Sequence, residues 1–99
     1  MKILIPVDEK DKNANITNIF KNKTWAIVTL ESGKVQNVDF IDDWTVGDEY
    51  IECVVVKSKT DHIWPFFEAS IPVLEAPTQE NIEEIMEAFI FKELYEVTM

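Results

Sequence analysis

The chain has 99 residues, 46% of them hydrophobic and 28% charged, which suits one globular domain over residues 1–99 and excludes a second domain. Nineteen acidic residues against nine basic ones give a formal net charge of −10 at pH 7. A surface of this sign repels nucleic acid, so we expect no nucleic-acid partner. Solubility is the simplest reason for the acidity, and a site for basic partners or cations is the alternative.

The first predicted element is a strand over residues 2–7, Lys-Ile-Leu-Ile-Pro-Val, which is apolar on both faces. That pattern is typical of a strand in the middle of a sheet. The apolar run is too short for a signal-peptide core or a membrane span, so we expect a cytoplasmic protein without membrane contact. The one cysteine, Cys53, cannot form an internal disulfide, which fits a reducing compartment.

A β-hairpin is predicted after a polar loop at residues 9–23. Residues 24–30 and 35–41 are rich in β-branched and aromatic side chains, and Gly33 between them suits a tight turn. The second strand mixes polar and apolar residues on both faces, so we expect it to be an edge of the sheet.

The second half of the chain is predicted to alternate strands and helices. A short acidic connection at 42–49 leads to an apolar strand at 50–56. Thr60 or Asp61 then caps a short helix that runs to about residue 69, because an oxygen of either side chain can accept an N–H of the first turn.

A short strand at 71–75 and an amphipathic helix complete the predicted elements. Pro77 and Thr78 open this helix, which runs from residue 79 to about residue 94 with one apolar stripe and a glutamate-rich outer face. The order strand, hairpin, then strand-helix-strand-helix predicts an α/β domain with a mixed five-stranded sheet.

Three segments, residues 1–8, 25–38 and 69–89, resemble the dinitrogenase iron-molybdenum cofactor biosynthesis family, whose members are related to nitrogenase cofactor carriers. The resemblance implies a ribonuclease H-like three-layer domain. It also implies a non-catalytic protein that binds or carries a metal cluster or its precursor, and so an iron-molybdenum or iron-sulfur species.

The chain departs from the family pattern at places where a ligand would bind. The family loop Ser-x-His-Phe-Gly corresponds to residues 17–21 here, where Phe20 is kept, Ile19 replaces the histidine and Lys21 replaces the glycine. The long helix that follows the third strand shrinks to residues 42–49, and residues 57–60 replace a glycine-containing turn. We therefore expect a divergent, trimmed member, with its metal and cofactor unknown.

Asp8, Phe20 and His62 form the predicted ligand-binding site. Asp8 ends the central strand, and ligands of open α/β sheets gather near strand ends. We place His62 in the first helical turn, where the dipole favours the neutral ring. Cys53 is predicted to be a buried core residue, about 10 Å of strand away from the loop of His62, so a metal shared by the two is disfavoured.

Asp8 and Asp42 give a second alternative, a metal-dependent hydrolase, because both lie at strand ends of one sheet. The charge opposes it, since the basic cluster available to meet a phosphate is small. That cluster consists of Lys21, Lys23, Lys57 and Lys59.

Aromatic residues supply a candidate protein-interaction surface, formed by Trp44, Trp64, Phe66 and Phe67. Trp64, Phe66 and Phe67 cannot all face the core from a short helix, so at least one should be partly exposed. The alternative is a satellite cluster that fills the space of the missing helix. An acidic interaction module with an unknown protein partner, monomeric or weakly dimeric, therefore stands beside the ligand-binding hypothesis.

Overall fold

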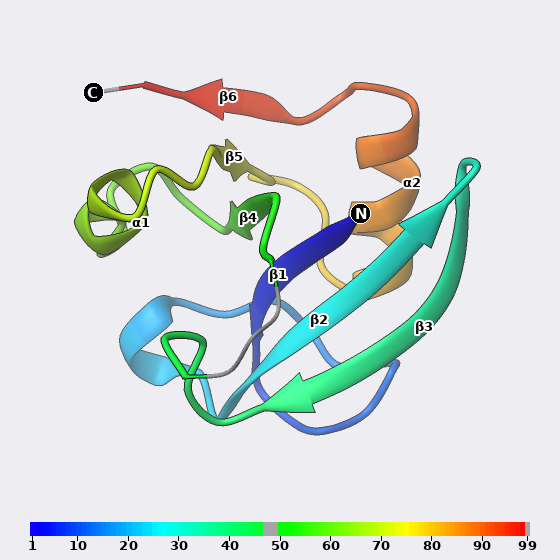
Figure 1. The fold of residues 1–99 in the computed structure, drawn as a ribbon, viewed down its shortest axis with the longest axis horizontal. Helices are drawn as coiled ribbons and strands as arrows, with labels where there is room; N and C mark the ends of the chain where they lie inside the picture. Colours follow the sequence, from blue (N-terminus) through cyan, green and yellow to red (C-terminus); the bar gives the residue numbers. More distant parts are fainter. Residues whose placement is uncertain (47–49, 99) are drawn as a thin grey trace.

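The computed structural model describes residues 1–46 and 50–98; residues 47–49 of the predicted acidic connection lie outside the described residues. Its centre is one six-stranded sheet with the strand order β3-β2-β1-β4-β5-β6 (Figure 1). The strands are β1 (Lys2–Val7), β2 (Thr24–Glu31), β3 (Lys34–Ile41), β4 (Cys53–Val56), β5 (Val73–Glu75) and β6 (Tyr95–Val97). No described helix is long and apolar enough to cross a membrane.

The central position predicted for the first strand is confirmed. β1 pairs with β2 in antiparallel register and with β4 in parallel register. Its residues from Ile3 to Val7 are buried, because helices or loops cover both faces of the sheet at this point.

The predicted hairpin and its edge strand are also confirmed. β2 and β3 pair antiparallel from Trp25↔Ile41 to Glu31↔Lys34. Ser32 and Gly33 between them have φ values of 52° and 74°, as a two-residue turn of the primed type requires. β3 is an outer strand of the sheet.

The two helices lie on opposite faces of the sheet, which gives three layers. α2 (Ile82–Ile90) packs Ile85 and Met86 against one face, together with Ile3 and Ile5 of β1. α1 (Trp64–Glu68) packs Phe66 against the other face. The alternation of buried side chains along the central strands therefore supplies both halves of the core.

The long helix is shorter than its apolar stripe predicts, and the five-strand count misses β6. The helix begins after Asn81, whose side chain accepts the N–H of Glu84, rather than at residue 79. It ends because Lys92 adopts a φ of 58°, while the N–H of Glu93 bonds to the Ala88 carbonyl as in a Schellman motif. The chain then reverses and pairs β6 antiparallel to β5.

The first helix is also shorter than predicted, because neither Thr60 nor Asp61 caps it. Its N-cap residue is Ile63, without a side-chain cap. The Asp61 carboxylate instead accepts the backbone N–H of Ile19 and of His62. At the other end Ser70 has a φ of 60° and closes the helix without glycine.

Candidate functional site

Two segments that follow neighbouring parallel strands meet at one end of the molecule. The 3-10 helix η1 (Ile19–Lys21) belongs to the connection after β1, and His62 belongs to the connection after β4. The ring centroids of Phe20 and His62 lie 4.8 Å apart. The Ile19 N–H donates to both Asp61 carboxylate oxygens, at 3.2 and 2.9 Å, and this charge-assisted bond fixes the two segments to each other.

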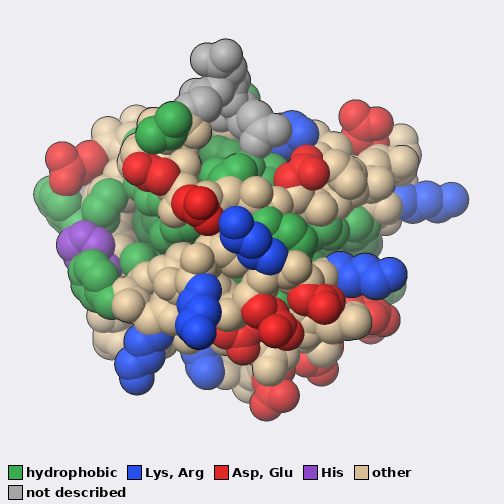
Figure 2. Space-filling view, turned by 90° about the horizontal axis from the view of Figure 1, so that it is seen from below, with side chains coloured by type: hydrophobic (Ala, Val, Ile, Leu, Met, Phe, Trp, Pro, Cys, Tyr) green, Lys and Arg blue, Asp and Glu red, His purple; other side chains and the backbone are tan. Residues whose placement is uncertain are grey.

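The local sequence explains why Phe20 points outward. Ile19 packs against the core on the α1 side of the sheet, so it anchors η1. Phe20, the next residue, is then 80% exposed. Figure 2 shows the histidine side chain with hydrophobic side chains on either side of it.

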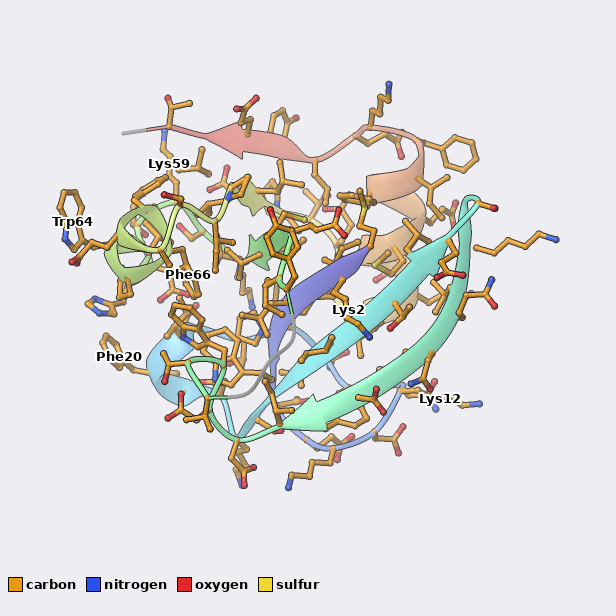
Figure 3. The ribbon with its side chains drawn as sticks, in the orientation of Figure 1. Lys2, Lys12, Phe20, Lys59, Trp64 and Phe66 are labelled. Carbon is orange, nitrogen blue, oxygen red and sulfur yellow. The ribbon has the colours of Figure 1, made fainter. Side chains whose placement is uncertain are left out.

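A hollow of about 530 Å³ adjoins His62. Its lining comes from the loop after β4, from α1 and from the end of β6: Lys59, Asp61, His62, Ile63, Trp64, Phe67, Val97 and Thr98. Trp64 is 57% exposed. Phe20, Trp64 and Lys59 lie at the same end of the molecule in Figure 3.

The charges around this hollow favour an anion over a cation. The Asp61 carboxylate already accepts backbone N–H groups, and Glu75 accepts the N–H of Lys59 at 2.7 Å. Within the described part of the chain, no carboxylate forms a salt bridge with the Lys59 ammonium. The ammonium is therefore available to a ligand.

Within residues 1–46 and 50–98, no hydrogen bond or ion pair joins Asp8 to Phe20 or His62. Its Oδ1 accepts the Asn15 N–H at 3.0 Å, inside the loop that follows β1. Asp42 forms an ion pair with Lys10, at 3.2 Å between Oδ1 and Nζ. Both carboxylates of the hydrolase hypothesis therefore have other partners in this structure.

The predicted aromatic surface divides into a buried part and an exposed part. Phe66 is 1% exposed, so its assignment to a surface is wrong. The centroid of its ring lies 4.7 Å from that of the Trp44 ring and 6.0 Å from that of the Trp25 ring. Trp44 and Phe67 are partly buried against the same cluster, as the alternative of a satellite cluster predicts, and Trp64 remains at the surface.

Cys53 is a core residue, as predicted. Burial, and secondarily the charge of Glu52, raises the pKa of its thiol to about 12, so the thiol is protonated at neutral pH. His62 does not share a site with it, because His62 is exposed at the end of the molecule beside Phe20. It also precedes the N-cap of α1 rather than lying in the first turn.

The described residues do not form a metal-binding group. Across residues 1–46 and 50–98, no three side chains of the types His, Cys, Asp and Glu gather closely enough to hold a metal ion. The donor chemistry at the Phe20–His62 contact is one imidazole beside a lysine, and it lacks the thiolates typical of iron-sulfur ligation.

Solved structures of similar fold were found. A crystal structure from Methanocaldococcus jannaschii, described as a "putative dinitrogenase", is 20% identical, with 99% of this chain and 95% of that chain covered and a TM-score of 0.76. The chain shares its fold. An NMR structure of a like-named protein from Methanococcus jannaschii is 19% identical, with 100% and 94% covered and a TM-score of 0.77.

A third structure, from Thermotoga, extends the comparison. It is described as a "putative NifB protein" of the DUF35 family, and it is 18% identical over 99% of this chain and 94% of that chain, with a TM-score of 0.73. These descriptions match the family that the sequence resembles, while identities this low establish the shared fold alone. No family model and no curated protein matches the sequence.

Sequence reasoning missed the contribution of β6 to the hollow. Val97 and Thr98 reach it because β6 pairs with β5, and the sequence predicted no element after the helix that was expected to end at about residue 94. Lys59 was predicted only as one of four lysines available to meet a phosphate, and its place beside His62 was not predicted.

Proposed function

We propose that this chain is a non-catalytic domain of the nitrogenase-cofactor-related type that binds a small anionic ligand at the surface formed by Phe20, Lys59, His62 and Trp64. The observation that carries the proposal is the Phe20–His62 ring contact beside the Lys59 ammonium, which forms no salt bridge with any described carboxylate. The fold shared with the dinitrogenase-related structures supports the type of domain. We also propose a ribonuclease H-like architecture, because three antiparallel strands precede the parallel pairs in the order 3-2-1-4-5.

The chemistry of this surface suits an anion for electrostatic reasons. Lys59 supplies a positive charge in a chain of net charge −10, and the nearest carboxylates already accept backbone N–H groups. The imidazole of His62 can donate a hydrogen bond from a ring nitrogen. The exposed rings of Phe20 and Trp64 exclude water beside it, which strengthens a charge interaction.

A metal cluster fits this surface only as an anion, not as a group ligated by thiolates. Cys53, the one cysteine, is buried with a pKa raised to about 12. Any iron-sulfur or iron-molybdenum species carried here would be cargo held by charge, by His62 and by ring contacts. A cytoplasmic location and the absence of nucleic-acid and membrane partners are kept as predictions.

The test is an NMR titration with two anionic probes, inorganic phosphate and molybdate. Either probe should shift the amides of residues 59–62 and the His62 ring signals, and Lys59→Ser should weaken binding about tenfold. The matched control is Lys34→Ser at the hairpin turn, far along the chain from the hollow, which should bind as the parent does. Equal weakening by both substitutions would reduce the binding to a general charge effect and end the proposal.

Protein interaction is the second candidate function, and the exposure of Phe20 and Trp64 favours it. Two large rings that are 80% and 57% exposed offer more apolar area than a small anion covers. If protein docking is the function, Trp64→Ser should abolish partner binding while phosphate and molybdate binding stay near the parent values. A change in anion binding alone would favour the first candidate.

A further inference from the structure

A second surface lies at the other side of the sheet, beside α2. A groove of about 490 Å³ runs between α2 and β3. Its lining is mostly apolar, with three charged side chains: Lys12, Asn13, Val35, Val38, Ile82, Glu83, Met86, Glu87, Ile90 and Phe91. Lys12 lies at the opposite end of the molecule from Trp64 in Figure 3, so this groove is separate from the surface proposed above.

The groove exists because one short helix covers this face of a wide sheet. Six strands span about 24 Å across the sheet, whereas a helix with its side chains is about 10 Å wide. α2 therefore leaves the outer strand β3 without a helix above it (Figure 1). Val35 is exposed and Val38 is only partly buried for this reason.

The floor and walls of the groove have the pattern that a second helix requires. Ile82 and Met86 are buried at its base, and Ile90 continues the same row at a spacing of four residues. Phe91, which is 68% exposed, stands at one end. Ile82 and Met86 are covered by the chain's own core, so the apolar surface open to another helix comes from Ile90, Phe91 and Val35.

The charges on the rim specify which helix fits. Glu83 and Glu87 are one turn apart on the groove side of α2, and the residues of α2 include no lysine or arginine. They outnumber Lys12, the single cation of the lining. Lysines or arginines spaced by four residues on a partner helix would meet the two carboxylates in register.

We propose that this groove docks a basic amphipathic helix of a partner protein, lying beside α2 with its apolar face on Ile90, Phe91 and Val35. A second copy of this chain is a poor occupant, because two copies each carry a net charge of −10 and a symmetric contact would bring their Glu83 and Glu87 side chains together. This proposal is independent of anion binding at the Phe20–His62 surface.

The experiment uses a synthetic amphipathic peptide of about 18 residues with one leucine stripe and lysines at four-residue spacing along its flank. A second peptide has glutamate in place of every lysine. Titrated into isotope-labelled protein, the lysine peptide should shift the amides of β3 and of Glu83, Glu87 and Phe91. It should bind at least about tenfold more tightly than the glutamate peptide.

Charge reversal gives the decisive comparison. The double substitution Glu83→Lys and Glu87→Lys should invert the preference between the two peptides, since both side chains are exposed and the fold is retained. The matched control is Glu93→Lys. It makes the same charge reversal at one residue outside the groove lining, and this variant should still bind the lysine peptide more tightly than the glutamate peptide. Trp64→Ser should leave peptide binding unchanged.

Four results would overturn the proposal. The first is a peptide preference that does not respond to the double reversal. The second is a set of shifts centred on α1 rather than on α2 and β3. The third is no binding at peptide concentrations up to about 1 mM. The fourth is a dimer, detected by light scattering, that Phe91→Ser abolishes. Such a dimer would show that a second copy of this chain occupies the groove.

Discussion

The backbone N–H of Ile19 donates to the carboxylate of Asp61, 42 residues further along the chain, at 2.9 Å. This bond joins the connection after β1 to the connection after β4 and holds Phe20 against His62. The position of Phe20 against His62 therefore depends on Asp61, whose side chain also borders the hollow.

Asp61→Asn should loosen this junction. The amide keeps one acceptor oxygen but loses the charge and the second oxygen, so we expect the free energy of unfolding to fall by about 1 kcal/mol. Nuclear Overhauser contacts between the Phe20 and His62 rings should weaken. Asp43→Asn is the control, because among the described residues the Asp43 carboxylate accepts its hydrogen bonds from Thr45 of its own turn. Ring contacts that stay unchanged in Asp61→Asn would contradict the assignment.

Phe66→Ala should be strongly destabilising. Phe66 is fully buried between the Trp25 and Trp44 rings, and its removal leaves a cavity, so we expect a loss of about 3 to 4 kcal/mol. Trp64→Ala, two residues away on the exposed side, should change stability by less than about 0.5 kcal/mol. Urea denaturation of both variants measures the difference in the free energy of unfolding. Similar losses of stability in the two variants would refute the assignment of Phe66 to the core and Trp64 to the surface.

Cys53 should give a pH dependence of stability at alkaline pH. Its pKa is raised from 9.0 to about 12 in the folded protein, so the unfolded chain releases the thiol proton first as the pH rises. The stability contributed by the protonated thiol is intact below pH 9 and is lost as the pH rises from 9 towards 12. Cys53→Ala should show a shallower decline across that window in denaturant titrations at several pH values.

Asn81→Ala should destabilise α2 by about 1 kcal/mol, because the Asn81 side chain accepts the N–H of Glu84 at 2.8 Å and caps the helix. The chain offers a matched control in Asn18. It holds the corresponding position before η1 without a side-chain cap bond. Thermal unfolding of Asn18→Ala should therefore resemble that of the parent. If Asn18→Ala and Asn81→Ala lowered the melting temperature equally, the Asn81 cap would not be the cause of the destabilisation.

Lys92→Gly should stabilise the protein. Lys92 has a φ of 58° at the end of α2, a conformation that glycine adopts without strain, so we expect a gain of about 0.5 to 1 kcal/mol. Lys92→Ala removes the same side chain without relieving the backbone and should give no gain. The melting temperatures of Lys92→Gly and Lys92→Ala are measured under identical conditions. An equal gain in stability from alanine would show that loss of the lysine side chain, and not relief of the backbone, stabilises the protein.

The order of elements, the central β1, the hairpin and the core position of Cys53 could all be predicted from the sequence, because each rests on local pattern. The end of α2 could not. Lys92 adopts a positive φ where a glycine would be expected, so the apolar stripe of the sequence continues through Leu94 without a stop signal, and β6 was not predicted. Tertiary pairing with β5, rather than local preference, makes residues 95–97 a strand.

The candidate site was predictable only in part for a similar reason. The sequence predicts that Phe20 and His62 belong to one ligand-binding site, and the structure brings their rings together. It does not bring Asp8 to them, because Asp8 accepts the N–H of Asn15 within its own loop. Whether a carboxylate at a strand end faces a shared site depends on loop hydrogen bonds that no pattern in the sequence encodes.

The strands of the sheet differ greatly in length. β2 and β3 have eight residues each, whereas β5 and β6 have three. Amide protons of β2, which is paired on both sides, should exchange with solvent mainly by global opening, while those of the short outer strand β6 exchange by local fraying. Val97 and Thr98 border the hollow beside His62, so we expect local detachment of β6 to widen that hollow, and entry of the proposed anion would then depend on the fraying rate of this one strand.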